Sequence, residues 1–65
     1  MIEFNVNDMT CGHCASTITR AVKEVDAAGK CEIDLGGKRV RIVSDRPSEE
    51  FRSAIEGAGF TPIPL

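Results

Sequence analysis

The chain has 65 residues and a formal net charge of −2, and 42% of its residues are hydrophobic. This composition is typical of one small globular domain, because a disordered chain has fewer apolar residues and a larger net charge. Nucleic-acid-binding proteins usually combine a strong basic excess with aromatic residues for base stacking, and both are missing here. We therefore expect a single domain over residues 1–65 with no nucleic-acid partner.

Membrane and secretion signals are missing as well. No apolar run approaches the roughly 20 residues that a helix needs to cross a bilayer. Residues 1–5 lack the basic and apolar regions of a signal peptide. We expect a cytoplasmic protein without direct membrane insertion. Because that compartment keeps thiols reduced, the three cysteines do not indicate a disulfide framework.

The first half of the chain predicts a strand, a loop and a helix. Apolar and polar residues alternate over residues 2–7, which is the period of a half-buried strand. A loop over residues 8–13 follows. From Cys14 onward the spacing becomes helical, with one apolar face made by Ile18, Ala21, Val22 and Val25. Gly29 is expected to end this helix.

The next segment predicts a hairpin of two strands. Apolar residues alternate over residues 31–35 and again around Val40 and Ile42. Gly36 and Gly37 stand between these runs, and we expect them to supply the positive φ angles of a tight turn. The two strands should therefore pair antiparallel.

The last third predicts a second helix and an edge strand. The helix opens with either Pro47 in its first turn or Ser48 as its cap. Its apolar face contains Phe51 and Ile55, and the glycines at positions 57 and 59 end it. Residues 60–65 form the last strand. Two of these residues are prolines, which cannot donate to a ladder, so this strand belongs at a sheet edge.

The element order βαββαβ predicts an α+β, ferredoxin-like open-faced sandwich. Two right-handed crossovers joined by a hairpin place two helices on one face of a four-stranded antiparallel sheet. This fold alone names no function, because many unrelated activities use it.

Chemistry is concentrated in the segment Cys11-Gly12-His13-Cys14, which runs from the first loop into the first helix. The positive end of a helix favours thiolates, and thiolates are soft ligands that select Cu(I), zinc or iron–sulfur clusters. Structural zinc and iron–sulfur clusters take about four protein ligands. The sequence offers one cysteine pair, one histidine and the nearby Asp8. Cu(I), which accepts two thiolates, fits this set best.

The segment Met9-Thr10-Cys11-Gly12-His13-Cys14 resembles the MTCxxC loop of the heavy-metal-associated domain family. This family includes bacterial cytosolic copper chaperones and the amino-terminal domains of copper-transporting P-type ATPases. The resemblance runs over residues 2–65 and includes Gly59-Phe60, where bacterial members often carry glycine followed by an aromatic residue.

The resemblance implies a carrier of Cu(I) rather than an enzyme. Cys11 and Cys14 would be the metal ligands, and Met9 would support the loop from below without binding metal. Phe60 would partly shield the site, while Thr10 and His13 would lie beside it. The implied partner is the metal-binding domain of a copper-transporting P-type ATPase, reached by thiolate exchange. The carrier would be a monomer or a copper-bridged dimer.

Two nearby residues leave the role of the site open. The family usually carries glycine where this chain has Asp8, and aspartate adopts left-handed backbone geometry less easily than glycine. We therefore expect a shifted loop or a carboxylate that helps a harder divalent ion. His13 is either a third ligand, a group whose protonation tunes metal release, or a solvent-facing side chain.

The identity of the metal is also open at this stage. Mercury accepts two thiolates like copper, but the periplasmic mercury carriers of the family need a signal sequence. Carriers selective for zinc or cadmium often place an acidic residue where this chain has Thr10. A dithiol oxidoreductase also uses Cys-Gly-His-Cys, although in a longer thioredoxin-type domain.

Cys31 is expected to be a buried core residue away from the pair.

Overall fold

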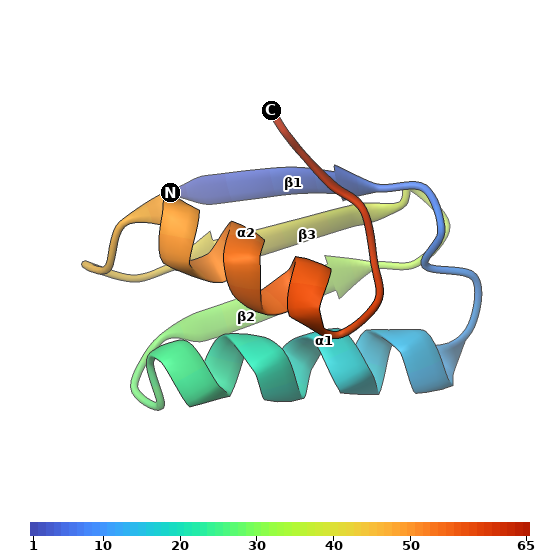
Figure 1. Ribbon diagram of the computed structural model, residues 1–65. Helices are drawn as coiled ribbons and strands as arrows, with labels where there is room; N and C mark the ends of the chain where they lie inside the picture. The colour runs from blue at the N-terminus through green and yellow to red at the C-terminus, as the bar shows by residue number, and fades with distance from the viewer.

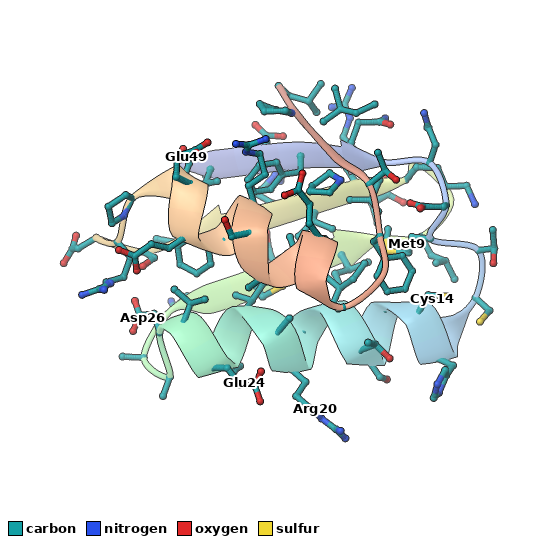
Figure 2. The ribbon with its side chains drawn as sticks, in the orientation of Figure 1. Met9, Cys14, Arg20, Glu24, Asp26 and Glu49 are labelled. Carbon is teal, nitrogen blue, oxygen red and sulfur yellow. The ribbon has the colours of Figure 1, made fainter.

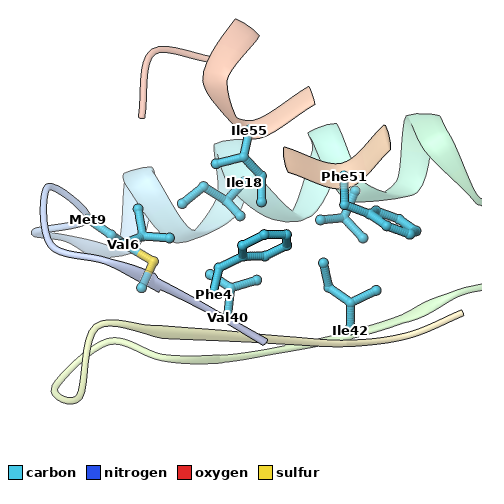
Figure 3. Packing of buried hydrophobic residues seen from close by; sticks show 9 residues of the cluster. Phe4, Val6, Met9, Ile18, Val40, Ile42, Phe51 and Ile55 are labelled. Atoms are coloured by element: carbon cyan, nitrogen blue, oxygen red, sulfur yellow. The ribbon is translucent and has the colours of Figure 1, made fainter. Parts of the chain in front are cut away.

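The computed structural model describes all residues from Met1 to Leu65. Its elements are β1 (Ile2–Val6), α1 (Gly12–Val25), β2 (Lys30–Asp34), β3 (Arg39–Val43), α2 (Ser48–Gly57) and β4 (Pro62–Pro64). The strands form one sheet in the order β2-β3-β1-β4, with every neighbouring pair antiparallel. Both helices cover the same face of this sheet (Figures 1 and 3). The predicted ferredoxin-like α+β fold is confirmed.

The last strand lies at the sheet edge, as its prolines predict. β4 pairs only with β1, where Pro62 faces Val6 and Pro64 faces Phe4. The strand covers three residues, fewer than the predicted range of 60–65. A proline has no N–H group to donate, so two of these three residues cannot extend a ladder. The position at the edge therefore costs the sheet no interior hydrogen bond.

The core lies between the helices and the covered face of the sheet (Figure 3). Every second side chain of β1 and β3 points into this layer, and so do the apolar faces of both helices. The core cluster consists of nine buried residues: Phe4, Val6, Met9, Ile18, Val22, Val40, Ile42, Phe51 and Ile55. Met9 is the only member that no helix or strand contributes, since it stands in the loop between β1 and α1.

The turn between β2 and β3 differs from the prediction. The loop has four residues, 35–38, because Asp34 pairs with Arg39, and the positive φ angle falls on Lys38 at 58°. Neither Gly36 nor Gly37 has a positive φ. A Cβ atom at Gly37 would lie 2.6 Å from an oxygen of the exposed Asp34 carboxylate, so that side chain would have to shift. That carboxylate accepts a hydrogen bond from the Gly37 amide at 3.0 Å.

The helix ends also differ from the prediction by a few residues. α1 ends at Val25, before Gly29, because Asp26 is extended and its carboxylate accepts a hydrogen bond from Ala28 N. At α2, Pro47 is the extended N-cap residue and Ser48 is the first helical residue. Pro47 thus stands one residue before the first turn, and Ser48 stands one residue after the cap, so each predicted alternative differs from the structure by one residue. Neither helix of the structure is long and apolar enough to cross a membrane.

Candidate metal site

The cysteine pair lies at the N-terminus of α1, directly after the loop that leaves β1. Figure 2 shows Cys14 at this end of the helix. Cys11 is exposed and is the N-cap residue, and its carbonyl accepts the first helical hydrogen bond from Ala15 N at 3.2 Å. Cys14 is half-buried in the first helical turn. The two Sγ atoms lie 3.6 Å apart. This geometry allows one small ion to contact both sulfur atoms.

The surroundings of the pair favour thiolates. No side chain caps α1, and its first turn carries no acidic residue, so its free N–H groups and positive dipole end remain available. A backbone hydrogen bond from Thr10 is the largest cause that lowers the pKa of Cys14, and the Cys11 thiol lowers it further. A thiolate, and not a thiol, is the form that binds metals and acts as a nucleophile.

The third cysteine lies at the other end of the sheet. Cys31 pairs with Ile42, which pairs with Ile2 at the start of β1. The loop of residues 7–11, here called the metal loop, instead follows the end of β1 at Val6. The four residue steps of β1 correspond to about 13 Å along the strand. Cys31 is half-buried against the core cluster, and burial raises its pKa. The structure therefore separates Cys31 from the pair, as the topology predicted.

The lowered pKa of Cys14 and the raised pKa of Cys31 predict that the two thiols are alkylated with different pH profiles. With the metal-free reduced protein, we expect the iodoacetamide reaction of Cys14 to reach half its maximal rate at a lower pH than that of Cys31. The sign follows because a lowered pKa gives thiolate at lower pH and a raised pKa delays it. Peptide mass spectrometry across a pH series measures both profiles, and a reversed order would contradict the described surroundings.

The backbone of Asp8 does not adopt left-handed geometry, because its φ is not positive. The loop shift expected from the replacement of glycine stays a prediction. The carboxylate instead accepts two hydrogen bonds from Thr61, one from the amide and one from the hydroxyl, both at 3.2 Å. Asp8 thus joins the metal loop to the segment before β4, and both of its carboxylate oxygens have protein partners.

The other candidate residues take up separate positions around the pair. Met9 is fully buried in the core cluster (Figure 3), while Thr10 and His13 are exposed. Phe60 is half-buried, packs against the core cluster and donates its amide to Ile55 O at 3.2 Å. The structure contains no group of three or more histidine, cysteine, aspartate or glutamate side chains placed to hold a metal ion. Of the predicted ligands, only Cys11 and Cys14 lie close together.

Sequence reasoning missed two residues that hold this loop. Lys38 donates from Nζ to the Met9 carbonyl oxygen at 2.8 Å, and Thr61 donates to Asp8 as described. The partners are separated by 29 and 53 positions in the chain. Contacts between residues so far apart leave no local pattern, and only the folded chain brings them together.

Comparison with known proteins places these features in a family. The sequence model of the heavy-metal-associated domain matches residues 3–61. The chain is 30% identical over 62 residues to the copper chaperone CopZ of Staphylococcus aureus, which covers 91% of each chain. The alignment therefore spans most of both chains.

Solved structures agree with this match. A gold-binding protein is similar with a TM-score of 0.95 and 31% identity over 100% of both chains. The copper chaperone Atx1 from Synechocystis PCC6803 has a TM-score of 0.92 and 35% identity, covering 95% of this chain and 98% of its own. The yeast copper transporter domain Ccc2a, solved in apo and Cu(I)-loaded states, has a TM-score of 0.89 and 26% identity over 98% and 92%. Sequence and structure together show that this chain belongs to the heavy-metal-associated domain family.

Proposed function

We propose that this protein is a cytosolic metallochaperone that binds Cu(I) through Cys11 and Cys14 and delivers it to a copper-transporting P-type ATPase. The observation that carries this proposal is the pair of sulfur atoms, 3.6 Å apart on an exposed helix N-terminus. Residues 1–65 would act as one heavy-metal-associated domain, and the protein would be a carrier without catalytic activity.

Copper is favoured by the donors that surround the site. Two thiolates are soft ligands, which suit Cu(I), whereas tetrahedral zinc sites use about four protein ligands. The Asp8 carboxylate is engaged with Thr61, and Cys31 lies at the far end of the sheet. The names of the relatives support the same metal, since CopZ and Atx1 are copper chaperones and Ccc2a was solved with Cu(I).

The different exposure of the two cysteines supports release by ligand exchange. In the proposed step, a partner thiol loses its proton to solvent and its sulfur forms a third bond to Cu(I). The bond from the exposed Cys11 then breaks and Cys11 takes up a proton. A second partner thiol loses its proton and binds Cu(I), after which the bond from Cys14 breaks and Cys14 takes up a proton. The metal stays Cu(I), so no electron is exchanged. The proposed partner is a copper-binding domain of the same fold, of the kind represented by the copper transporter domain Ccc2a.

The compartment and the assembly state complete the proposal. A free thiol pair requires a reducing compartment, which supports the cytosol. The single exposed sulfur of Cys11 supports a monomeric carrier, since a partner can approach it. A copper-bridged dimer, in which a second copy supplies the incoming thiolates, uses the same exposed sulfur. Size-exclusion chromatography of the loaded protein distinguishes these two states.

An anaerobic competition titration tests the proposed metal. The reduced protein is titrated against a Cu(I) chelator of known affinity, with Zn(II), Hg(II) and Au(I) in parallel. Au(I) is included because one similar structure is a gold-binding protein. We expect tight binding of one Cu(I) per chain and at least about a hundredfold weaker binding of Zn(II), which lacks two further ligands here.

Other results would replace the proposal. Tighter binding of Zn(II) that depends on Asp8 or His13 would assign the chain to divalent-metal handling. If the protein binds no metal tightly but reduces disulfide substrates, the dithiol oxidoreductase interpretation takes its place.

A further inference from the structure

Lys38 occupies an unusual place in the backbone. It is the only residue other than glycine with a positive φ, at 58°, and two glycines directly precede it. A side chain in this conformation brings Cβ too close to the backbone, so glycine is the usual occupant. Strain of this kind persists where the surrounding structure requires it. The contacts of Lys38 indicate what that requirement is.

Both the backbone and the side chain of Lys38 contact the segment that leads to the cysteine pair. Its carbonyl oxygen accepts a hydrogen bond from Val6 N at 2.8 Å, at the end of β1. Its Nζ donates to the Met9 carbonyl oxygen at 2.8 Å, and the lysine is half-buried. The Met9 amide donates back to Val6 O at 3.1 Å. Three hydrogen bonds thus hold the chain between the end of β1 and Met9.

The peptide group that Lys38 holds lies directly before Cys11 in the chain. The Met9 carbonyl and the Thr10 N–H belong to one planar peptide unit, so fixing the oxygen fixes the direction of the N–H group. Thr10 directly precedes Cys11 in the chain. The Cα atoms of Met9 and Cys11 are at most about 7.6 Å apart, because two peptide units separate them. A rigid Met9 carbonyl therefore leaves the first cysteine little freedom.

We propose that Lys38 is a positioning residue for the metal site, whose ammonium group holds the Met9–Thr10 peptide and so orients the loop that carries Cys11. The metal-binding part of this inference rests on the proposed function, whereas the effect on the loop does not. A glycine at position 38 would relieve the backbone strain but would lack the ammonium group. Lys38 both adopts the positive φ of the turn and donates a hydrogen bond to the Met9 carbonyl.

Three substitutions separate positioning from general stability. Lys38→Met removes the ammonium group and keeps the backbone strain, whereas Lys38→Gly removes both. Lys38→Arg retains a long cationic donor. Lys30→Met is the matched control, because Lys30 is exposed at the start of β2 and lies with Cys31 at the far end of the sheet. We expect Lys38→Gly to unfold at a higher temperature than Lys38→Met.

Two measurements on each variant test the inference. In the metal-free protein, we expect backbone order parameters at Thr10 and Cys11 to fall from about 0.85 toward 0.6 in Lys38→Met and Lys38→Gly, and to recover in Lys38→Arg. In the loaded protein, we expect both variants to bind Cu(I) about fivefold more weakly despite their different unfolding temperatures. Lys30→Met should match the wild type in both measurements.

The inference is overturned if the order parameters of Thr10 and Cys11 are unchanged in Lys38→Met and Lys38→Gly. It is also overturned if Cu(I) affinity falls only in Lys38→Met, because the loss would then follow stability alone. A wild-type protein that binds no Cu(I) would end the proposed function, while the metal-free order parameters would still decide the role of Lys38.

Discussion

Replacement of Cys11 or of Cys14 by serine is expected to reduce Cu(I) affinity by at least about a hundredfold. A serine hydroxyl stays protonated at neutral pH and is a hard donor, so each variant leaves one thiolate at the site. Zinc sites with four ligands gain about 10–16 kcal/mol on binding, or roughly 3 kcal/mol per ligand, and each 1.4 kcal/mol is a factor of ten. The competition titration with a Cu(I) chelator measures the loss directly.

Cys31→Ser is the matched control for this prediction, since it makes the same chemical change in the same chain. Cys31 is half-buried at the far end of the sheet, so we expect its replacement to leave Cu(I) affinity within about twofold of the wild type. We expect the variants Cys11→Ser and Cys14→Ser to have similar unfolding temperatures. Loss of Cu(I) binding in Cys31→Ser, or full binding by either single-site variant of the pair, would contradict the two-thiolate site.

The fold was largely predictable because its elements depend on local spacing. Alternation over residues 2–7 predicted β1, which ends one residue earlier at Val6, and the two prolines of β4 placed that strand at the edge. Such patterns report which face of an element is buried, and burial of these faces against one another then restricts the topology. The position of Cys31 away from the pair followed from that topology alone.

What the sequence did not predict depends on contacts between distant segments. The hairpin glycines suggested positive φ angles at positions 36 and 37, but the four-residue loop places that angle on Lys38. Asp8 suggested a shifted loop or a carboxylate near a divalent ion, and the sequence did not indicate that this carboxylate accepts two hydrogen bonds from Thr61. In each case a polar side chain finds its partner only when the chain is folded, so spacing along the sequence carries no signal for it.

Met9 presents the opposite problem, because its chemistry and its position suggest different roles. A thioether is a soft ligand that can bind Cu(I), and Met9 stands two residues before Cys11. The side chain is nevertheless 0% exposed and packs in the core cluster with Val6 (Figure 3). The burial favours a packing role that fixes the loop from below. Substitutions that keep or remove the volume of the side chain can separate the two roles.

Met9→Leu keeps the apolar volume and removes the sulfur, and we expect it to lower stability by less than about 1.5 kcal/mol and to leave Cu(I) affinity nearly unchanged. Met9→Ala leaves a cavity and should cost about 2–5 kcal/mol, which lowers the unfolding temperature of so small a domain by roughly 10 °C or more. A chain of this length has about 3–10 kcal/mol of stability, so Met9→Ala risks unfolding altogether. Thermal unfolding and the chelator titration measure both variants. If Met9→Leu folds normally yet loses Cu(I) as severely as Cys11→Ser, Met9 is a ligand and the packing role is refuted.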